Sequence, residues 1–280
     1  MAILAEPAAG SGLRMLDDLG VLSVLLPESL AMRATRQPAP HRFDVWEHSL
    51  RAVEAADAVL AELDVLDPWG ETLRVHLAQD LGDRVTRREL LKLGALLHDV
   101  AKPETLRREG GRIRFIGHAV QGAGRARRVA ERFRLSRRAA ELVERLVAEH
   151  LRPMHLAQSG NVTRRARYRF FRALQDDARD LLLLALADAA AVSGEAPRDV
   201  WRGPGGRILR ELMRGMTEEA LAAEVPPLVR GEEVMRAFGL APGPEVGRLL
   251  SRAREAQALG LVGTAEEALQ YLRRVGGGPP

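Results

Sequence analysis

The sequence predicts an all-α fold, a helical bundle with further helical segments at both ends. Apolar residues recur at the three- and four-residue spacing of amphipathic helices through most of the 280 residues. No stretch shows the sustained alternation of apolar and polar residues that indicates a half-buried strand. Capping residues, prolines and glycines divide the chain into segments of ordinary helix length.

The N-terminal segment is expected to contain two short helices. Residues 12–26, GLRMLDDLGVLSVLL, are interrupted at Gly20, and Pro27 closes the second helix. Residues 33–42 follow as a polar, proline-containing connector. We therefore place the first domain boundary after residue 40.

The central part is expected to begin with a long helix from Asp44, a typical N-cap residue, to about Leu63. Thr86 caps the next helix, which ends before Pro103 because the residue preceding a proline disfavours the helical conformation. Residues 108–118, REGGRIRFIGH, are predicted to form a glycine-containing loop or a short hairpin. Further helices are predicted near 118–133, 136–151, 163–174, 179–192 and 205–215.

The C-terminal part is predicted to be a helical tail. Residues 224–231, EVPPLVRG, are expected to link into three short helices that end near Arg274, and the final GGGPP is expected to be disordered. The expected organisation is an N-terminal segment, a central domain and a C-terminal tail, at 1–40, 41–200 and 201–280.

The composition limits the location and the chemistry of the chain. No run of about twenty apolar residues could span a membrane, and the N-terminus lacks a secretory signal, so we expect a cytoplasmic protein. Cysteine is absent, so any metal must be held by His, Asp or Glu. The net charge is only +4, and aromatic residues make up 4% of the chain, which argues against extensive stacking on nucleic-acid bases.

The most informative stretch is LGALLHDVAKPE, residues 93–104, in which an apolar helix ends in His98 and Asp99. A buried carboxylate is costly unless a partner neutralises it. Consecutive helical residues lie about 100° apart, so both side chains can turn toward one inward point. The imidazole could bind a metal ion there, and the carboxylate could bridge two.

Four more side chains are predicted to point inward from other helices: His48, His118, His150 and Asp188. Asp188 is the most telling, because it lies within LLLLALADAAAV, where an unpaired carboxylate would cost on the order of several kcal/mol. Each residue alone has another explanation, since a histidine can fill a core or surface role and Asp188 can pair with an arginine. Together, on separate helices, they favour a metal site.

The other three histidines are not assigned to this site. His41 and His76 lie in loop-like or polar surroundings and are predicted to be surface residues. His155 follows Pro153, just outside the predicted helix of His150, and is given no role.

The order His … His-Asp … His … His … Asp resembles the HD superfamily of metal-dependent phosphohydrolases. The nearer resemblance, roughly over residues 10 to 275, is to the C-terminal half of bacterial tRNA nucleotidyltransferases and poly(A) polymerases. The segments that carry it are HRFDVWEHSL, LGALLHDVAKPET, IRFIGHAVQGA, EHLRP and LLLLALADA. That family's nucleotidyltransferase head is not matched, and residues 1–40 are too few to encode it, so we expect no nucleotide addition by this chain alone.

The resemblance implies an HD-domain bundle with two metal positions that share Asp99. The first ion would be bound by His48, His98, Asp99 and Asp188, and the second by Asp99, His118 and His150. With a single ion, the last two histidines would instead contact phosphate. Such ligands accept Mn, Fe, Ni, Co or Mg, and two ions would position a phosphate and generate a nucleophile from water.

Asp99 and Lys102 are the predicted catalytic residues. Lys102 matches a lysine common after this family's His-Asp pair and could neutralise phosphate charge, with an ion pair at a helix C-terminus as the alternative. The predicted substrate-binding residues are Arg152 and a stripe on one helix face, Arg165, Arg169 and Arg172. A solvated face is the alternative explanation for that stripe.

The expected function is a divalent-metal-dependent phosphodiesterase or phosphatase acting on nucleotides or RNA 3′ ends, with 2′,3′-cyclic phosphates implied by the resemblance alone. The first alternative is a non-catalytic tRNA-binding module that assists a separately encoded nucleotidyltransferase. The second is a degenerate structural relative, which the full ligand set disfavours. Neither a membrane nor DNA is expected as a partner.

Overall fold

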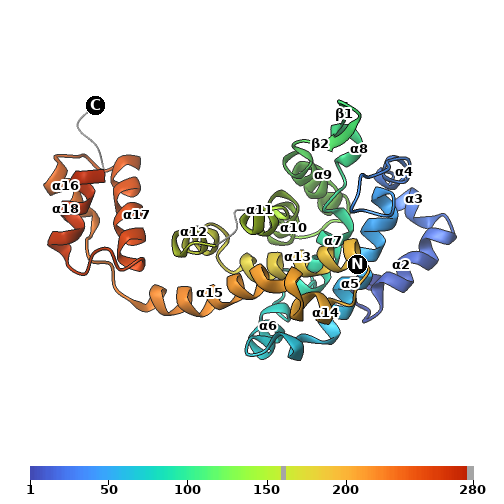
Figure 1. Cartoon of the computed structure of the whole chain (residues 1–280), viewed down its shortest axis with the longest axis horizontal. Helices are drawn as coiled ribbons and strands as arrows, with labels where there is room; N and C mark the ends of the chain where they lie inside the picture. The colour runs from blue at the N-terminus through green and yellow to red at the C-terminus, as the bar shows by residue number, and fades with distance from the viewer. Residues whose placement is uncertain (159–161, 276–280) are drawn as a thin grey trace. The chain divides into compact units, whose positions relative to one another are not determined.

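The computed structural model describes residues 1–158 and 162–275 (Figure 1), with side chains described for all of these except 158 and 218–224. The predicted all-α class is confirmed, because helices form almost all of the regular structure. The strands form one two-stranded sheet. Within these described residues, no helix is long and apolar enough to cross a membrane. The predicted disordered end, 276–280, lies outside the described residues.

The chain groups into two compact units. The first contains residues 1–161 and 176–213, and the second contains residues 162–175 and 214–280. The predicted division at residues 40 and 200 stays a prediction. Each unit is described below by itself.

Four short helices open the first unit: α1 (Ala2–Ala5), α2 (Ala9–Asp18), α3 (Val21–Leu25) and α4 (Glu28–Arg33). Gly20 separates α2 from α3 with a φ of 73°, a left-handed conformation that glycine adopts without strain. Arg14 ties α2 to the core through Glu47, with Nη1 and Oε2 2.8 Å apart. The break predicted at Gly20 is therefore present.

Five helices build the core of the first unit: α5 (Val45–Ala61), α7 (Arg87–Leu97), α9 (His118–Arg132), α10 (Arg137–Glu149) and α13 (Asp177–Ser193). The predicted caps are present, since Asp44 accepts a hydrogen bond from the Glu47 N–H at 2.8 Å and Thr86 forms a capping box with Glu89. A Cβ on Gly94 would lie 2.9 Å from Leu146, so this glycine lets α7 and α10 approach closely.

Short elements connect these helices: η1 (Leu63–Leu66), α6 (Gly70–Leu77), α8 (Lys102–Thr105), β1 (Leu106–Glu109), β2 (Arg112–Phe115), α11 (Arg152–Gln158), α14 (Pro197–Arg202) and η2 (Pro204–Gly206). The strands pair antiparallel around Gly110 and Gly111, both with positive φ, so the predicted loop is a hairpin. The sequence did not predict α6, α11 and α14. Helices of six to eight residues show too few apolar repeats for periodicity to identify them.

The second unit combines α12 (Arg164–Leu174), the part of α15 (Arg207–Glu224) that begins at residue 214, and the tail helices α16 (Gly231–Phe238), α17 (Pro244–Ala258) and α18 (Ala265–Val275). The tail has its own small apolar core, which includes Val234, Leu249, Ala256 and Leu272. The three predicted tail helices are therefore present. Helix α12, which the sequence placed in the central domain, groups with this tail.

Candidate metal centre

Five helix ends or faces of the first unit bring the six predicted metal ligands together. His98 and His150 are the C-cap residues of α7 and α10, Asp99 follows His98, and His118 begins α9. His48 projects from the first turn of α5 and Asp188 from the second half of α13. All are buried except Asp188, whose side chain is 30% exposed. Asp188, predicted to point inward from an apolar helix, is thus the most exposed of the six ligands.

The first group of ligands is His48, His98 and Asp188. The two histidine Nε2 atoms lie 3.2 Å apart, and His48 Nε2 lies 3.0 Å from Asp188 Oδ1. His98 Nε2 lies 3.6 Å from the same oxygen. Three ligand atoms thus face one point.

The second group is Asp99, His118 and His150. Asp99 Oδ1 lies 3.3 Å from His118 Nε2 and 3.7 Å from His150 Nε2, and the two Nε2 atoms are 3.2 Å apart. The other carboxylate oxygen, Oδ2, lies 3.2 Å from His98 Nε2 and 3.7 Å from His48 Nε2. Asp99 therefore turns one oxygen toward each group, as a bridging ligand must.

The backbone sets the orientation of three of the four imidazoles. His98, His118 and His150 each donate a hydrogen bond from Nδ1–H to the carbonyl three residues earlier, at 2.8, 2.7 and 2.8 Å. A carbonyl can only accept, so Nδ1 carries a proton in each ring and Nε2 is the nitrogen that faces the cluster. This is the tautomer that metal binding through Nε2 requires.

Burial and neighbouring charges shift the pKa values of the cluster. Burial opposes ionisation of Asp99, but His98 and Lys102 hold the pKa of its carboxyl well below the usual range. Burial lowers the pKa of His98, yet Asp99 raises it more, to about 9. Burial and His98 lower the pKa of His150 to about 4. His150 is therefore neutral at pH 7 and Asp99 ionised, the states that a metal needs, while an ion at His98 must displace a proton.

Unpartnered oxygens provide the test of fit to a metal. Both carboxylate oxygens of Asp99 and the Oδ1 of Asp188 are buried without a hydrogen-bond partner, and Lys102 forms an ion pair with one oxygen of Asp99. Buried ionised groups left in that state are strongly destabilising, and divalent cations relieve the cost. Four imidazoles and two carboxylates, without thiolates, are a donor set suited to borderline or hard divalent ions. The residues present thus fit one or two metal ions.

A family model for the HD domain matches residues 45–193, a span that includes all six ligands. The chain belongs to the HD domain family. HD domains bind divalent metals and are typically metal-dependent hydrolases. The resemblance stated from the sequence is thereby confirmed.

Two curated relatives match almost the whole length of this chain. The CC-adding tRNA nucleotidyltransferase of Thermus thermophilus is 38% identical over 275 residues, which cover 96% of this chain and 54% of the relative. The A-adding tRNA nucleotidyltransferase of Deinococcus radiodurans is 33% identical over 279 residues, which cover 98% of this chain and 56% of the relative. The chain spans about half the length of the curated relatives it matches.

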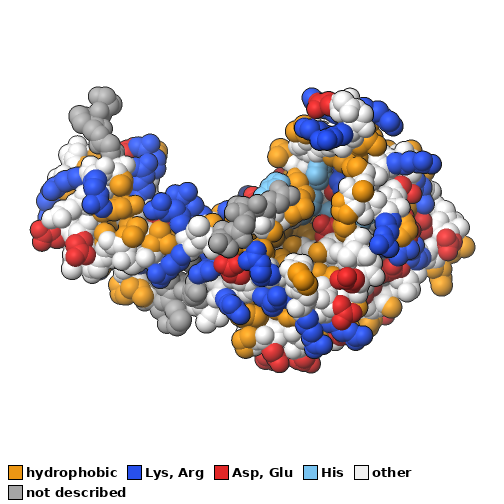
Figure 2. Space-filling model, viewed as in Figure 1, with side chains coloured by type: hydrophobic (Ala, Val, Ile, Leu, Met, Phe, Trp, Pro, Cys, Tyr) orange, Lys and Arg blue, Asp and Glu red, His pale blue; other side chains and the backbone are white. Residues whose placement is uncertain are grey.

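A cavity of about 910 Å³ lies beside the second ligand group of the HD domain. Figure 2 shows histidines inside a hollow with hydrophobic side chains around it. The lining includes His118, Lys102 and Arg152, so the structure brings two predicted substrate or catalytic cations to the metal ligands. Lys102 Nζ lies 2.5 Å from Asp99 Oδ2 and donates to Gln37 Oε1 at 2.6 Å, and Arg152 pairs with Glu149 at 3.2 Å.

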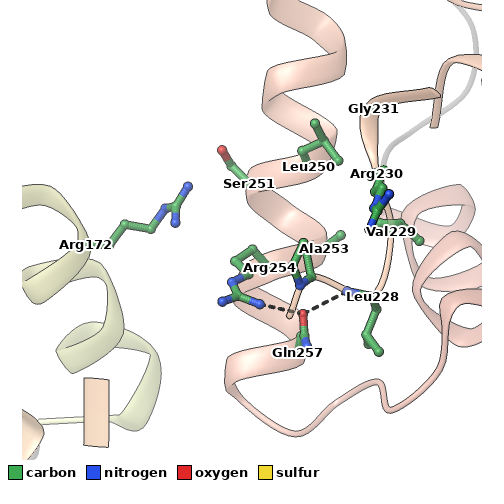
Figure 3. A pocket seen from close by; sticks show the side chains of 11 residues that line it. Arg172, Leu228, Val229, Arg230, Gly231, Leu250, Ser251, Ala253, Arg254 and Gln257 are labelled. Atoms are coloured by element: carbon green, nitrogen blue, oxygen red, sulfur yellow. Dashed lines mark hydrogen bonds between the residues drawn. The ribbon is translucent and has the colours of Figure 1, made fainter. Parts of the chain in front are cut away.

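The arginine stripe of α12 is not part of this cavity. Arg165 and Arg169 both pair with Glu255 of α17, at 2.9 and 3.1 Å. Arg172 lines a different cavity, within the second unit (Figure 3). Substrate binding by these three arginines stays a prediction, and the structure gives two of them a packing role within their own unit.

Two histidines predicted at the surface are half-buried or buried. His41 is half-buried, lines the 910 Å³ cavity and packs its ring 4.9 Å from that of His48. Burial, Lys102 and His48 lower its pKa to about 4. The polar connector around His41 gave no periodic signal that could have placed it.

His76 is buried in the short helix α6, so its predicted surface position is wrong. Its Nε2 lies 2.7 Å from Asp180 Oδ2, and Arg87 Nη1 lies 2.6 Å from the same oxygen. Asp180 is completely buried, although in the sequence it reads as an ordinary acidic residue in the first turn of α13. This buried ion cluster is separate from the metal ligands.

Proposed function

We propose that the HD domain of this chain is a divalent-metal-dependent phosphohydrolase that acts on phosphodiesters or phosphomonoesters of nucleotides or RNA ends. The observation that carries the proposal is the position of Asp99, whose two oxygens each face a different set of histidines.

The ligands would hold two ions. His48, His98, Asp188 and one oxygen of Asp99 would bind the first ion, and the other oxygen of Asp99 with His118 and His150 would bind the second. When bound, two such ions neutralise phosphate charge and lower the pKa of water. The native ion would be one or more of Mn, Fe, Ni, Co or Mg.

Other side chains of the cavity would bind and orient the substrate. Lys102 is held between Asp99 and Gln37, which fixes its ammonium group next to the cluster, where it would add positive charge toward a phosphate. Arg152, the first residue of α11, lines the same cavity and would contact a further oxygen of the substrate. Ile116, Val120 and Met154 line the cavity and are 59%, 77% and 48% exposed, so they offer an apolar surface to a sugar or base.

The site and the relatives together support the proposed substrate class. A cavity of about 910 Å³ accepts a ligand much larger than a phosphate ion. The relatives' names are those of tRNA nucleotidyltransferases, which favours an RNA 3′ end, including one with a 2′,3′-cyclic phosphate, over unrelated phosphoesters. The proposed location of this reaction is the cytoplasm.

The test is hydrolysis with defined metals. Purified protein is stripped with EDTA, reloaded with Mn, Ni, Co or Mg, and assayed with 2′,3′-cyclic AMP, 2′-AMP and bis-p-nitrophenyl phosphate. We expect hydrolysis of at least one substrate by the wild type and none by Asp99→Ala, with Asp176→Asn as a matched carboxylate control. Equal rates for wild type and Asp99→Ala with every metal would contradict the proposed enzymatic function.

The second candidate is a non-catalytic module that binds tRNA and assists a separately encoded nucleotidyltransferase. It is favoured by the chain's match to about half of two tRNA-specific enzymes and by the arginines of α12. A gel shift with tRNA separates the two functions. Binding that persists in Asp99→Ala but is lost when Arg165, Arg169 and Arg172 are replaced by glutamine would support the module.

A further inference from the structure

The β1–β2 hairpin of the first unit has one strongly basic face. Side chains alternate between the two faces of a strand. Two cross-strand pairs form the basic face: Arg107 with Arg114, and Glu109 with Arg112. All four residues are exposed, and Figure 2 shows Lys and Arg side chains gathered over the hairpin. Three guanidinium groups thus stand against a single carboxylate on this face.

The charge of this face is not neutralised by the rest of the first unit. Within the described part of that unit, its three arginines have no ion-pair partner. Glu104, the acidic residue that precedes the hairpin, pairs with Arg125 at 2.6 Å. The remaining side chains of the unit, at 158–161, are uncharged in the sequence. Like charges directly opposite each other destabilise a strand pair, so folding of the hairpin does not explain Arg107 opposite Arg114.

The other face of the hairpin borders the cavity of the metal centre. Ile113 and Phe115 are half-buried and line the 910 Å³ cavity together with Arg114. The Phe115 carbonyl accepts the hydrogen bond from Nδ1 of the metal-ligand candidate His118 at 2.7 Å. The Phe115 ring centroid lies 5.5 Å from Lys102 Nζ. The basic face therefore begins at the rim of the cavity, next to the predicted ligands and Lys102.

The spacing of the arginines suits a chain of phosphates. Alternate residues of a strand lie about 6.8 Å apart, so Arg112 and Arg114 can contact successive phosphates of an extended nucleic-acid strand. Guanidinium groups bind phosphate oxygens through paired hydrogen bonds, and such contacts position a strand without reading its sequence. A mononucleotide in the cavity would leave the hairpin face uncovered, whereas a strand that continues out of the cavity would cover it.

We propose that the basic face of the hairpin binds the phosphate backbone of a single-stranded RNA whose 3′ end occupies the cavity. This inference rests on the proposed phosphohydrolase function for the position of the RNA end, and it adds that the substrate is a strand and not a free nucleotide. Charged residues on a hairpin can also serve only to prevent association with strands of other molecules. That role predicts that RNA binding does not depend on these arginines.

The test measures binding without catalysis. The full chain, in EDTA to prevent metal-dependent hydrolysis, is titrated into a fluorescein-labelled oligouridine dodecamer, and fluorescence anisotropy gives the Kd over a range of salt concentrations. Each phosphate contact with a single strand contributes about 0.7 to the slope of log K against log salt concentration. Replacing Arg107, Arg112 and Arg114 together by glutamine should therefore reduce this slope by about two and weaken binding by about 100-fold at about 0.1 M salt.

The matched control removes the same charge from exposed arginines of the first unit that form ion pairs: Arg132, Arg137 and Arg198. Their combined replacement by glutamine should leave the salt slope unchanged, and thermal unfolding verifies that both triple variants are folded. An equal loss of RNA binding in the two variants, or no loss in the hairpin variant, would overturn the proposal. Equal competition by polyglutamate and by unlabelled RNA would also overturn it, and would indicate an acidic protein as the partner.

A second measurement locates the RNA on the wild-type chain. Photo-crosslinking with a dodecamer that contains 4-thiouridine should label the segment 106–120, and crosslinks confined to other segments would contradict the proposal. The result is separable from that of the hydrolysis assay. RNA binding through the hairpin without hydrolysis of any phosphoester would contradict the proposed enzyme and support this surface. Hydrolysis of 2′,3′-cyclic AMP without hairpin-dependent RNA binding would contradict the surface alone.

Discussion

Helix α13 carries two aspartates in opposite situations. Asp180, near its N-terminus, is completely buried and is contacted by Arg87 and His76 at 2.6 and 2.7 Å. Asp188, two turns later, is 30% exposed and is contacted by the imidazoles of His48 and His98. Both lie on a helix that is apolar over most of its surface.

The difference shows that burial of a carboxylate does not by itself indicate a metal. The nature of its partners separates the two sites. A guanidinium has no acceptor and neutralises Asp180 permanently, whereas an imidazole Nε2 can offer a lone pair beside Asp188 to a shared cation. We therefore expect one end of α13 to stabilise the fold and the other to bind metal, and four substitutions test that division.

The largest effect is expected from Asp99→Ala, which removes the group shared by both ligand sets. Metal affinity should fall by more than about 100-fold, because residues that merely orient a metal ligand already contribute 10- to 100-fold. Metal analysis after dialysis and calorimetric titration with Mn²⁺ measure this. Wild-type metal content in this variant would remove Asp99 from the site.

Arg87→Met should have the largest effect on stability. It leaves Asp180 buried without its cation, which costs about 3–5 kcal/mol in free energy of unfolding, measured by urea titration. Metal affinity should not change. The double variant Arg87→Met/Asp180→Asn is the control, and it should recover part of the loss because the uncompensated charge is gone. No recovery would mean that packing, and not charge, is the cause.

Asp188→Asn should show the reverse pattern. Metal affinity should fall by roughly 10- to 100-fold through loss of a charged ligand, while the metal-free protein should unfold at the same or slightly higher denaturant concentration. The expected gain has a physical reason, because an unpartnered carboxylate oxygen is removed. A loss of several kcal/mol without metal would instead place Asp188 in the same class as Asp180.

The smallest effect concerns Asp176, which precedes α13. A hydrogen bond from Arg179 holds the pKa of its carboxyl below the usual value against the opposing effect of burial. A lowered folded-state pKa stabilises the protein above the unfolded value near 3.8, and this is lost as the pH falls through the folded pKa. Because the pair is largely exposed, wild type and Asp176→Asn should differ by about 0.2–1 kcal/mol at pH 6, and this difference should disappear near pH 2. A difference in the free energy of unfolding that is the same at both pH values would show that ionisation of Asp176 does not contribute to stability.

Periodicity and capping chemistry determine much of the helical framework because they are local. Asp44, Thr86 and Gly20 mark helix boundaries. The two caps act on residues a few positions away and the glycine through its own backbone conformation, so the sequence alone predicts these boundaries. The short helices α6 and α11 were not predicted because their seven or eight residues show too few apolar repeats. The placement of His76 failed for the same reason.

The six metal-ligand candidates could be named from the sequence because each lies on an apolar stripe or at a helix end where a polar residue is out of place. Their residue types already specify a divalent cation held without thiolates. What the sequence could not supply is the distinction among buried charges. In the sequence, Asp180 is an ordinary acidic residue of a first helical turn and Asp188 a carboxylate in an apolar run. Only the packing of α13 against other helices buries Asp180 beside an arginine and places Asp188 beside a pair of imidazoles. The spacing of Arg165, Arg169 and Arg172 likewise predicts that the three side chains share one helix face. In the tertiary structure the first two pair with Glu255, and the third lines a cavity within the second unit. The sequence could not show this difference, because a carboxylate from a distant segment can reach only part of a helix face.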